Sequence, residues 1–389
     1  MPMRGSPPPD CPFARIKSGA GVVRRAGDCN SRPMVKLRRH SADIFPVLGF
    51  LVALASLGAA LDPVFVAIML GASVVTAVHH AEVVAHRVGE PFGTLILALA
   101  VTVIEVGLIL TLMQAEPDKA MTLARDTVFA AVMVILNLLM GLCLLVGSIR
   151  HHEQRFQRTG IGAALATLTV LTVLTLVLPN YTSTIPGPFY SPEQLGFVAA
   201  VSLVLYATFA LVQTVRHRDY FLPDEAQEDA EAHAAPPSAG RMWASLALLV
   251  ACLFAVVLLA KNLSPVIGAA LDTAGAPPAV LGVLIAALIL APEGLAAVRA
   301  ARANRLQTSL NLALGSALAT IGLTIPAVAV LSIATGLHIS LGLDAKSAVL
   351  LFLSLIVASQ TLANGRTTVL QGAIHLMLFA VYLFTTFVP

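Results

Sequence analysis

The stretch PFGTLILALAVTVIEVGLILTLM, residues 91–113, governs how the rest of the chain is interpreted. It is apolar over a length that spans a hydrocarbon core of roughly 30 Å, and it carries one carboxylate, Glu105, near its middle. An ionisable group at bilayer depth costs at least about 2.5 kcal/mol on insertion scales, so it is rarely retained without a function. The stretch therefore predicts a transmembrane helix with a functional acid.

A second stretch repeats this pattern. Residues 277–297 read PPAVLGVLIAALILAPEGLAA, again an apolar span with a single acid, Glu293. Two intramembrane carboxylates in one chain favour a transport function, because such groups mark ion and proton pathways.

The composition agrees with a polytopic membrane protein. Of 389 residues, 57% are hydrophobic and only 12% are charged, whereas about 25% charged residues are usual in soluble domains. The net charge of +3 is small and its basic residues are scattered between apolar spans, so they indicate topology rather than a nucleic-acid partner. The four cysteines include no CxxC pair, so neither zinc nor a disulfide framework is expected.

Apolar segments of membrane length follow one another along the chain. They predict an all-α polytopic membrane protein with about eleven transmembrane helices. The predicted spans are 44–61, 63–86, 91–113, 126–147, 161–178, 192–215, 242–262, 278–298, 307–332, 344–363 and 367–388.

The basic residues of the short loops predict the orientation, because Lys and Arg are enriched on the cytoplasmic side. Most fall on one side: those of the N-terminal tail, Arg87, Arg150, Arg155, Arg158, Arg216, Arg218, Arg241, Arg299, Arg302, Arg305 and Arg366. The exceptions are Lys119, Arg125, Lys261 and Lys346. The N-terminus is therefore predicted to be cytoplasmic and the C-terminus external.

Composition also divides the chain into segments. We expect a disordered basic tail (1–40), in which Met34 is an alternative start, an additional first helix (44–61), a first repeat (62–221), an acidic cytoplasmic linker (222–241) and a second repeat (242–389). Five spans on each side of the linker would enter the membrane from opposite faces, as in inverted repeats. Glu105 and Glu293 each lie in the second span of their half, so both are predicted to reach the midplane.

Two carboxylates at the midplane suit a site that binds a cation and protons in turn. Calcium prefers oxygen ligands, and two carboxylates neutralise its charge. Buried carboxyl groups also accept protons near neutral pH, because desolvation disfavours the charged form. Neighbouring spans offer further oxygen ligands, namely Thr102, Asn137, Ser316 and Thr320, although a lone Ser or Thr in a membrane helix commonly bonds its own backbone. Pro292 and Pro326 are predicted to free backbone carbonyls, as broken helices do.

Histidines near the cytoplasmic ends of spans leave a second interpretation open. His79, His80, His86, His151 and His152 are reminiscent of membrane di-iron enzymes, but they lack repeated ligand pairs on one helical face. His79 and His80 can alternatively sense pH. With Glu82 and Glu90 they flank the predicted cytoplasmic mouth, where the acids can attract cations.

Three segments resemble a known family. HAEVVAHRVGEPFGTLILALAVTVIEV (80–106), LAPEGL (290–295) and GRTTVLQGAIHL (365–376) closely resemble the ChaA-type calcium(sodium, potassium)/proton antiporters of bacteria. This family belongs to the calcium/cation antiporter superfamily, in which each repeat carries Gly-Asn-x-x-Glu. In this chain the motif maps to residues 101–105 and 289–293, where the glutamates match and the Gly-Asn pairs do not. The resemblance implies that Glu105 and Glu293 carry out the exchange.

We therefore expect a secondary antiporter of the bacterial inner membrane that exports calcium, and also sodium or potassium, in exchange for protons. The expected partners are membrane lipid and small cations, without nucleic acid and with homo-oligomers left open. No cofactor and no enzymatic activity are expected, and no nucleotide-binding Gly-x-x-x-x-Gly-Lys-[Ser/Thr] occurs. The alternatives are a passive cation channel and, less favoured, the di-iron enzyme.

Overall fold

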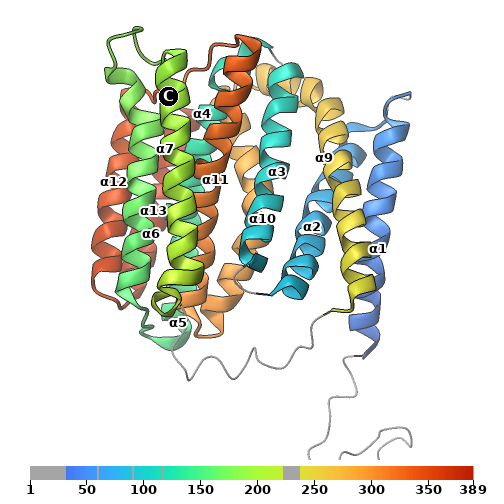
Figure 1. The fold of residues 1–389 in the computed structure, drawn as a ribbon, viewed down its shortest axis with the longest axis horizontal. Coiled ribbons are helices and arrows are strands. Elements are labelled where there is room, and N and C mark those ends of the chain that lie inside the picture. The colour runs from blue at the N-terminus through green and yellow to red at the C-terminus, as the bar shows by residue number, and fades with distance from the viewer. Residues whose placement is uncertain (1–31, 59–60, 90–91, 116, 222–236, 389) are drawn as a thin grey trace, which may run out of the picture.

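The computed structural model describes residues 32–58, 61–89, 92–115, 117–221 and 237–388, and this part of the chain is almost entirely helical (Figure 1). Its helices form eleven successive runs, and nine of these are long and apolar enough along their described lengths to cross a membrane. The predicted all-α membrane fold with about eleven transmembrane helices is therefore confirmed. The tail up to residue 31 and residues 222–236 of the predicted linker lie outside the described residues.

Six runs precede the linker and five follow it. The first six are α1 (Arg32–Ala55), α2 (Pro63–Val88), α3 (Phe92–Ala115), the continuous run of α4 (Pro117–Met133), the π-helix η1 (Val134–Leu139) and α5 (Met140–His151), the run of α6 (Arg158–Thr172), η2 (Val173–Val177) and η3 (Leu178–Tyr181), and α7 (Pro192–Leu211) with η4 (Val212–Arg216), followed by the short η5 (Arg218–Tyr220). The last five are α9 (Ala239–Thr273), α10 (Ala279–Arg302), α11 (Leu306–Thr335), α12 (Ala345–Ala363) and α13 (Val369–Phe387).

Some helices extend beyond the predicted spans. α1 begins at Arg32 instead of residue 44, and α9 continues to Thr273 instead of ending at residue 262. An apolar window marks only the part of a helix that crosses hydrocarbon, whereas a helix can continue where long polar side chains reach water. In α9 the exposed Lys261 is such a residue, and the helix passes through Pro265 without ending.

Two helices, α7 and α13, begin with the same hydrogen-bonding pattern. At α7 the Ser191 amide donates to Gln194 Oε1 (3.0 Å), and at α13 the Thr368 amide donates to Gln371 Oε1 (2.8 Å). Both are capping-box bonds, which satisfy amide groups that a helix start leaves without partners. α7 and α13 are the fifth helices of the two predicted repeats, so the same local signal occurs at equivalent positions.

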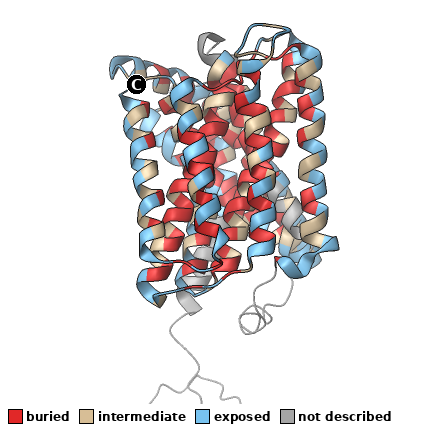
Figure 2. Ribbon diagram, turned by 90° about the vertical axis from the view of Figure 1, so that its left-hand side faces the viewer, coloured by how far each residue is buried: buried red, intermediate tan, exposed pale blue. Residues whose placement is uncertain are grey.

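Burial separates an inner from an outer set of helices (Figure 2). The run from α4 to α5 is buried over most of its length, whereas α7 and α13 expose large apolar side chains such as Val204 and Met377. Helices that are apolar on all faces fit a hydrocarbon environment, because their outward side chains face lipid.

Packing places α11 at the centre of the predicted site. α2 and α9 lie side by side, and α1 and α3 pack against both, as Figure 1 shows. α11 packs against α3 and α10, the helices that carry Glu105 and Glu293, and it also contacts α7. α10 in turn packs against α4 and α5.

Two pairs of loops close opposite ends of the bundle. Arg155, between α5 and α6, forms an antiparallel β-bridge with Arg366, between α12 and α13. Ser340, between α11 and α12, forms an antiparallel β-bridge with Phe189, between η3 and α7. The first pair lies at the end where the linker leaves α7, and the second lies at the end where the chain terminates (Figure 1).

Candidate functional site

Glu105 lies in the interior of α3 and is only 2% exposed. Thr320 of α11 donates its hydroxyl to Glu105 Oε2 at 3.0 Å. Within the described part of the chain, the second carboxyl oxygen, Oε1, accepts no hydrogen bond. A buried carboxyl oxygen without a protein donor retains the capacity to bind a cation or a proton.

Glu293 lies on α10 and is half-buried. Its Oε2 accepts a short hydrogen bond from the hydroxyl of Ser316, also on α11. The charges of Glu293 and Glu105 are close enough to interact. The structure therefore brings the two predicted carboxylates together, with α11 bonded to both.

The α11 contribution is a hydroxyl stripe, consisting of Ser316, Thr320 and Thr324. These residues are spaced four apart, so they lie one above another on one helical face. Thr324 is buried close to the Glu105 carboxyl group, and in the described residues its hydroxyl has no hydrogen-bond partner. Sequence reasoning missed Thr324, although the spacing of four that continues from Ser316 and Thr320 was visible in the sequence.

The other two predicted ligands have different surroundings. Thr102 is buried on α3, one turn before Glu105. Asn137 is buried on the π-helix η1, where its amide nitrogen donates to Ser354 Oγ of α12 (2.9 Å) and to Met133 Sδ (3.7 Å). Its Oδ1 has no partner in the part of the chain that the structure describes. The Asn137 amide nitrogen therefore links η1 to α12, and its carbonyl oxygen is available as a ligand.

The two membrane prolines do not break their helices. α10 continues through Pro292, and α11 continues through Pro326. The predicted freeing of backbone carbonyls does not require the helices to break, and it stays a prediction. A proline still removes the amide that would bond the carbonyl four residues earlier, which is Leu288 in α10 and Gly322 in α11.

The predicted mouth residues lie towards one end of α2. His80 is fully buried and its ring lies 5.5 Å from that of His79, whereas Glu82 is exposed. The charge of Glu82 interacts with those of Arg299 and Glu293. Glu90 lies outside the described residues. Among the predicted mouth residues, Glu82 has a charge that interacts with one member of the carboxylate pair, Glu293.

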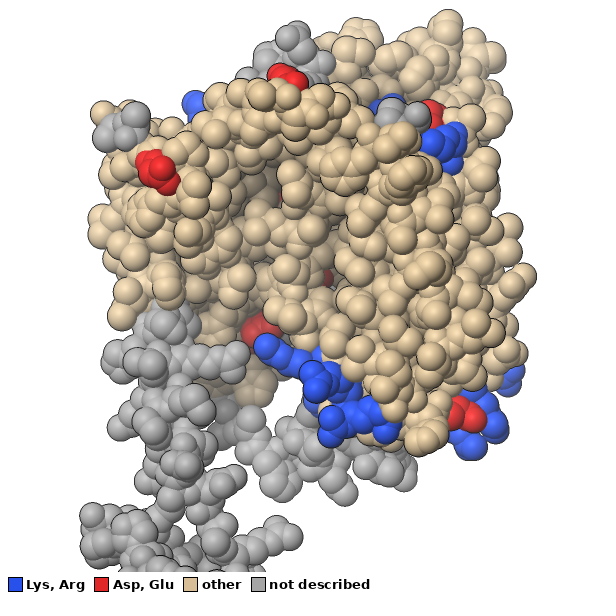
Figure 3. Space-filling model, turned by 180° about the vertical axis from the view of Figure 1, so that it is seen from behind, with Lys and Arg blue, Asp and Glu red and all other residues tan. Residues whose placement is uncertain are grey.

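The surface around this end is basic. Figure 3 shows Lys and Arg side chains gathered mainly along the lower edge of the molecule, with an acidic side chain visible in the depth of a hollow above them. His151 Nε2, at the same end, donates to the carbonyl of Arg302 at 3.0 Å. Among the described residues, no group of three or more His, Cys, Asp or Glu side chains is arranged to hold a metal ion, so the di-iron alternative has no site there.

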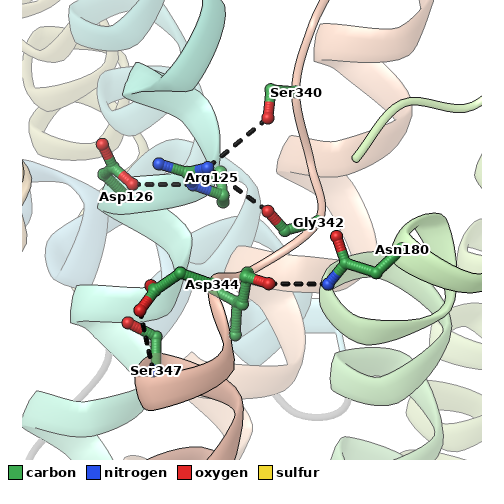
Figure 4. A network of polar contacts seen from close by, with 8 residues as sticks. Arg125, Asp126, Asn180, Ser340, Gly342, Asp344 and Ser347 are labelled. Carbon is green, nitrogen blue, oxygen red and sulfur yellow. Dashed lines mark hydrogen bonds and ion pairs between the residues drawn. The ribbon is translucent and has the colours of Figure 1, made fainter. Parts of the chain in front are cut away.

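A separate polar network lies at the opposite end of the bundle (Figure 4). Arg125 of α4 pairs with Asp126 (2.8 Å) and donates to the carbonyl of Gly342 (3.2 Å). Asp344 caps α12 through the amide of Ser347 (3.3 Å). Burial raises the pKa of Asp344, but the hydrogen bonds from Ser347 and the nearby positive charges outweigh it and lower the pKa below the ordinary value. This network holds the loop between α11 and α12 against α4.

Chemically, the site offers hard oxygen donors and two exchangeable charges. Carboxylates with hydroxyls match the ligand preference of calcium and other hard cations. The same carboxyl groups can instead carry protons, so cation and protons would compete for them.

Comparison with known proteins places this geometry in context. The sodium/calcium exchanger protein family matches residues 46–215 and 244–388. The putative ionic transporter y4hA of Sinorhizobium fredii is 46% identical over 89% of this chain and 95% of its own length. The sodium-potassium/proton antiporter ChaA of Escherichia coli is 38% identical over 92% of this chain and 99% of its own. The crystal structure of the H+/Ca2+ exchanger CAX has the same fold, with a TM-score of 0.70 and 17% identity over 90% of this chain and 89% of its own.

Proposed function

The chain belongs to the sodium/calcium exchanger protein family, and from this premise we propose that it is a cation/proton antiporter whose exchange site is formed by Glu105 and Glu293. One observation supports this assignment above the others: α11 bonds both carboxyl groups, through Thr320 and Ser316, one turn apart on the same face. Carboxylates brought together inside a membrane protein form a site rather than two isolated buried acids.

The resemblance to ChaA-type antiporters is confirmed by the family match and by the Escherichia coli relative. The chain is a multi-pass membrane transporter of the secondary type and not an enzyme. Neither the passive channel nor the di-iron enzyme finds support among these relatives.

The proposed cargo is calcium, with sodium or potassium as further substrates. Two carboxylates neutralise one divalent charge, and hydroxyl and carbonyl oxygens would complete a hard-cation site. The sodium-potassium/proton activity named for the Escherichia coli relative supports monovalent cations as well.

Exchange follows from competition at one site. Deprotonated Glu105 and Glu293 bind a cation from the cytoplasm, and protons from outside displace it once the site faces outward. The neutral, protonated site then returns inward. The empty site carries two charges and does not cross, because uncompensated charge at bilayer depth is costly, and this couples the two fluxes.

The two acids have different roles in access. Glu293 is half-buried and interacts with the exposed Glu82, whereas Glu105 is buried. A cation that approaches from the face of Glu82 therefore meets Glu293 before Glu105. We infer that the structure represents a conformation that faces the cytoplasm.

Equivalent loop contacts support two inverted repeats, residues 62–221 and 242–389. In each half the loop after the third run reaches across to the loop before the fifth run of the other half: Arg155 bridges to Arg366, and Ser340 bridges to Phe189. Each of these two loops also contacts the other half near the place where its second run ends and its third begins. In one loop, Gln154 Nε2 donates to the carbonyl of Ala301, near the end of α10 (2.9 Å). In the other, the Ser340 amide donates to the carbonyl of Met121 (2.8 Å).

These contacts lie at opposite ends of the bundle (Figure 1), which is the relation that an inverted repeat requires. We name them the Gln154 clasp (residues 151–158 with 301–307 and 363–367) and the Asn180 clasp (residues 336–344 with 121–125 and 176–189). The capping boxes at the starts of α7 and α13 follow the same correspondence.

The proposed location is the bacterial inner membrane with a cytoplasmic N-terminus. The arginine-rich edge in Figure 3 is the end where the linker joins the bundle, and the positive-inside rule places such an end in the cytoplasm. The C-terminus lies at the opposite, external end.

The function is tested in everted membrane vesicles that carry a respiration-generated pH gradient. Addition of calcium should collapse the gradient with the native protein. Glu105→Gln and Glu293→Gln should each abolish this response while the protein remains in the membrane. Thr172→Val is a matched control, because Thr172 is buried and its hydroxyl donates to carbonyls of its own helix, those of Leu168 and Thr169. Normal exchange in either glutamine variant would contradict the site, and calcium flux without proton counterflow would contradict antiport.

A further inference from the structure

A groove outside the transport helices runs between α6 and α12, two neighbouring helices at the outer edge of the bundle (Figure 1). It encloses about 250 Å³, and its floor is formed by apolar and small side chains that include Leu165, Ala166 and Ala363. Gly162 of α6 also lines it, and a Cβ at that position would meet no atom within 4 Å, so the space beside this glycine is open. The groove faces the surroundings of the bundle and not the carboxylate pair.

One end of this groove is basic. Arg158 is the first residue of α6, is exposed, and lines the groove with one guanidinium nitrogen 3.4 Å from the carbonyl of Ala363. Arg155 and Arg366 meet in the adjacent β-bridge, and the nearby acid Glu153 is paired with Arg366 at 3.2 Å. The end of the groove therefore carries a net positive charge.

The start of α6 adds to this positive potential. The side chain of its N-cap residue, Gln157, makes no capping bond to the helix. The first amides of the helix point towards its N-terminal end, where the helix dipole favours anions. Ser359, which also lines the groove, lies one turn of α12 before Ala363, about 6 Å deeper. The groove thus has positive charge at one end, a hydroxyl next to it and apolar walls beyond. This order matches the phosphate, the glycerol ester region and the acyl chains of a phospholipid.

We propose that this groove binds one anionic phospholipid, with its phosphate on Arg158 and an acyl chain along Gly162 and Ala166. The opposite charges and the apolar walls together select this occupant. A second copy of the chain across a two-fold axis would bring the same arginines face to face, which is unfavourable. Because α6 and α12 come from different halves of the chain, the lipid would join the two halves at the arginine-rich face. This site is independent of the cation that is exchanged.

Purified protein in detergent provides the test. Phosphatidylglycerol should raise the unfolding temperature of the native protein, and phosphatidylcholine should not. Arg158→Gln should weaken the apparent affinity for phosphatidylglycerol about fivefold, the effect of one arginine near an anionic lipid surface. Gly162→Phe keeps the charge but fills the groove, so it should remove the stabilisation as well. Native mass spectrometry of both variants should show fewer retained phosphatidylglycerol molecules.

Arg87→Gln is the matched control, because Arg87 is an exposed arginine in the last turn of α2 and does not line the groove. It should respond to phosphatidylglycerol as the native protein does. Equal losses in Arg87→Gln and Arg158→Gln would mean a diffuse surface-charge effect and overturn the site. Stabilisation by inorganic phosphate alone, by phosphatidylcholine, or to the full extent in Gly162→Phe would also overturn it.

Discussion

Glu105 and Glu293 each lie near the middle of a helix, α3 and α10 respectively, yet their surroundings differ. Glu105 is 2% exposed and has one oxygen without a protein donor in the described residues. Glu293 is half-buried and interacts with the exposed Glu82. The donors to both carboxyl groups come from α11, with Thr320 bonded to Glu105 and Ser316 bonded to Glu293.

Two acids that lie near the middle of their helices can therefore have unequal surroundings. Thr320 and Ser316 lie on the third run of the second half, and the first half contributes the π-helix η1 in its third run instead. Under the proposed function, Glu293 is the outer acid of the cytoplasmic path and Glu105 is the inner one. The following experiments change the two acids, their hydroxyl donors, the two clasps and Glu82.

Shortening each acid should give the largest difference. Glu105→Asp keeps the charge but withdraws the carboxyl group from Thr320 at a buried position, so exchange should fall about tenfold to 100-fold, the value of a lost hydrogen bond to a charged group. Glu293→Asp should cost less than about fivefold, because water can replace the lost partner in a half-buried position. Initial rates of calcium-driven proton flux in everted vesicles measure both.

Equal losses in the two aspartate variants would remove the distinction between an inner and an outer acid. A larger loss at Glu293 would reverse it. Western blotting of the vesicles controls for the amount of inserted protein.

Removing the hydroxyl donors should give an intermediate effect. Thr320→Val removes a bond that favours the charged form of Glu105, so protons should compete better and the pH optimum of exchange should move upward, with an apparent cation affinity at neutral pH lowered about fivefold to tenfold. Ser316→Ala should act in the same direction but only about twofold to threefold. A pH series of half-saturating calcium concentrations distinguishes this shift from a simple loss of protein. A downward shift of the optimum in either variant would contradict the role of the hydroxyls.

The two clasps contain similar side-chain bonds, and they should affect stability more than exchange. Gln154 donates to the carbonyl of Ala301 and Asn180 donates to the carbonyl of Leu343 (2.6 Å). Gln154→Ala and Asn180→Ala should each lower the free energy of unfolding by about 1–3 kcal/mol, because a carbonyl loses its partner in a contact that is buried at Gln154 and partly buried at Asn180. Exchange per folded molecule should change less than about twofold. Denaturant unfolding in detergent measures the first quantity, and the double variant should be additive because the clasps are far apart.

Most of the fold was predictable from the sequence because the signal is local. A run of apolar residues long enough for a bilayer predicts a helix without any knowledge of its neighbours, and the eleven spans follow from it. The helix ends were less predictable: α9 continues past Lys261 to Thr273, since water at the membrane surface tolerates a longer helix. The clasps were not predictable, because they are backbone and side-chain bonds between loops far apart in the chain.

The site was predictable in its charges and less so in its partners. Glu105 and Glu293 stand out because each is alone in an apolar span, and Ser316 and Thr320 were visible as polar residues in another span. That Ser316 bonds Glu293 while Thr320 bonds Glu105 depends on how α11 packs between α3 and α10. The bond from Asn137 to Ser354 and the π-helix around Asn137 likewise depend on tertiary packing, which no spacing in the sequence reveals.

The smallest expected effect concerns Glu82, which acts on Glu293 and not directly on Glu105. Glu82→Gln removes a negative charge from the proposed path, so the half-saturating calcium concentration should rise about twofold to threefold at low ionic strength, in the range of exposed charge pairs. The effect should fade at high salt, because counterions screen exposed charges. Glu153→Gln is the control, since Glu153 is also exposed at this end but is paired with Arg366. An unchanged value for Glu82→Gln at low salt, or a loss that persists at high salt, would place Glu82 off the cation path and leave Glu293 without its outer neighbour.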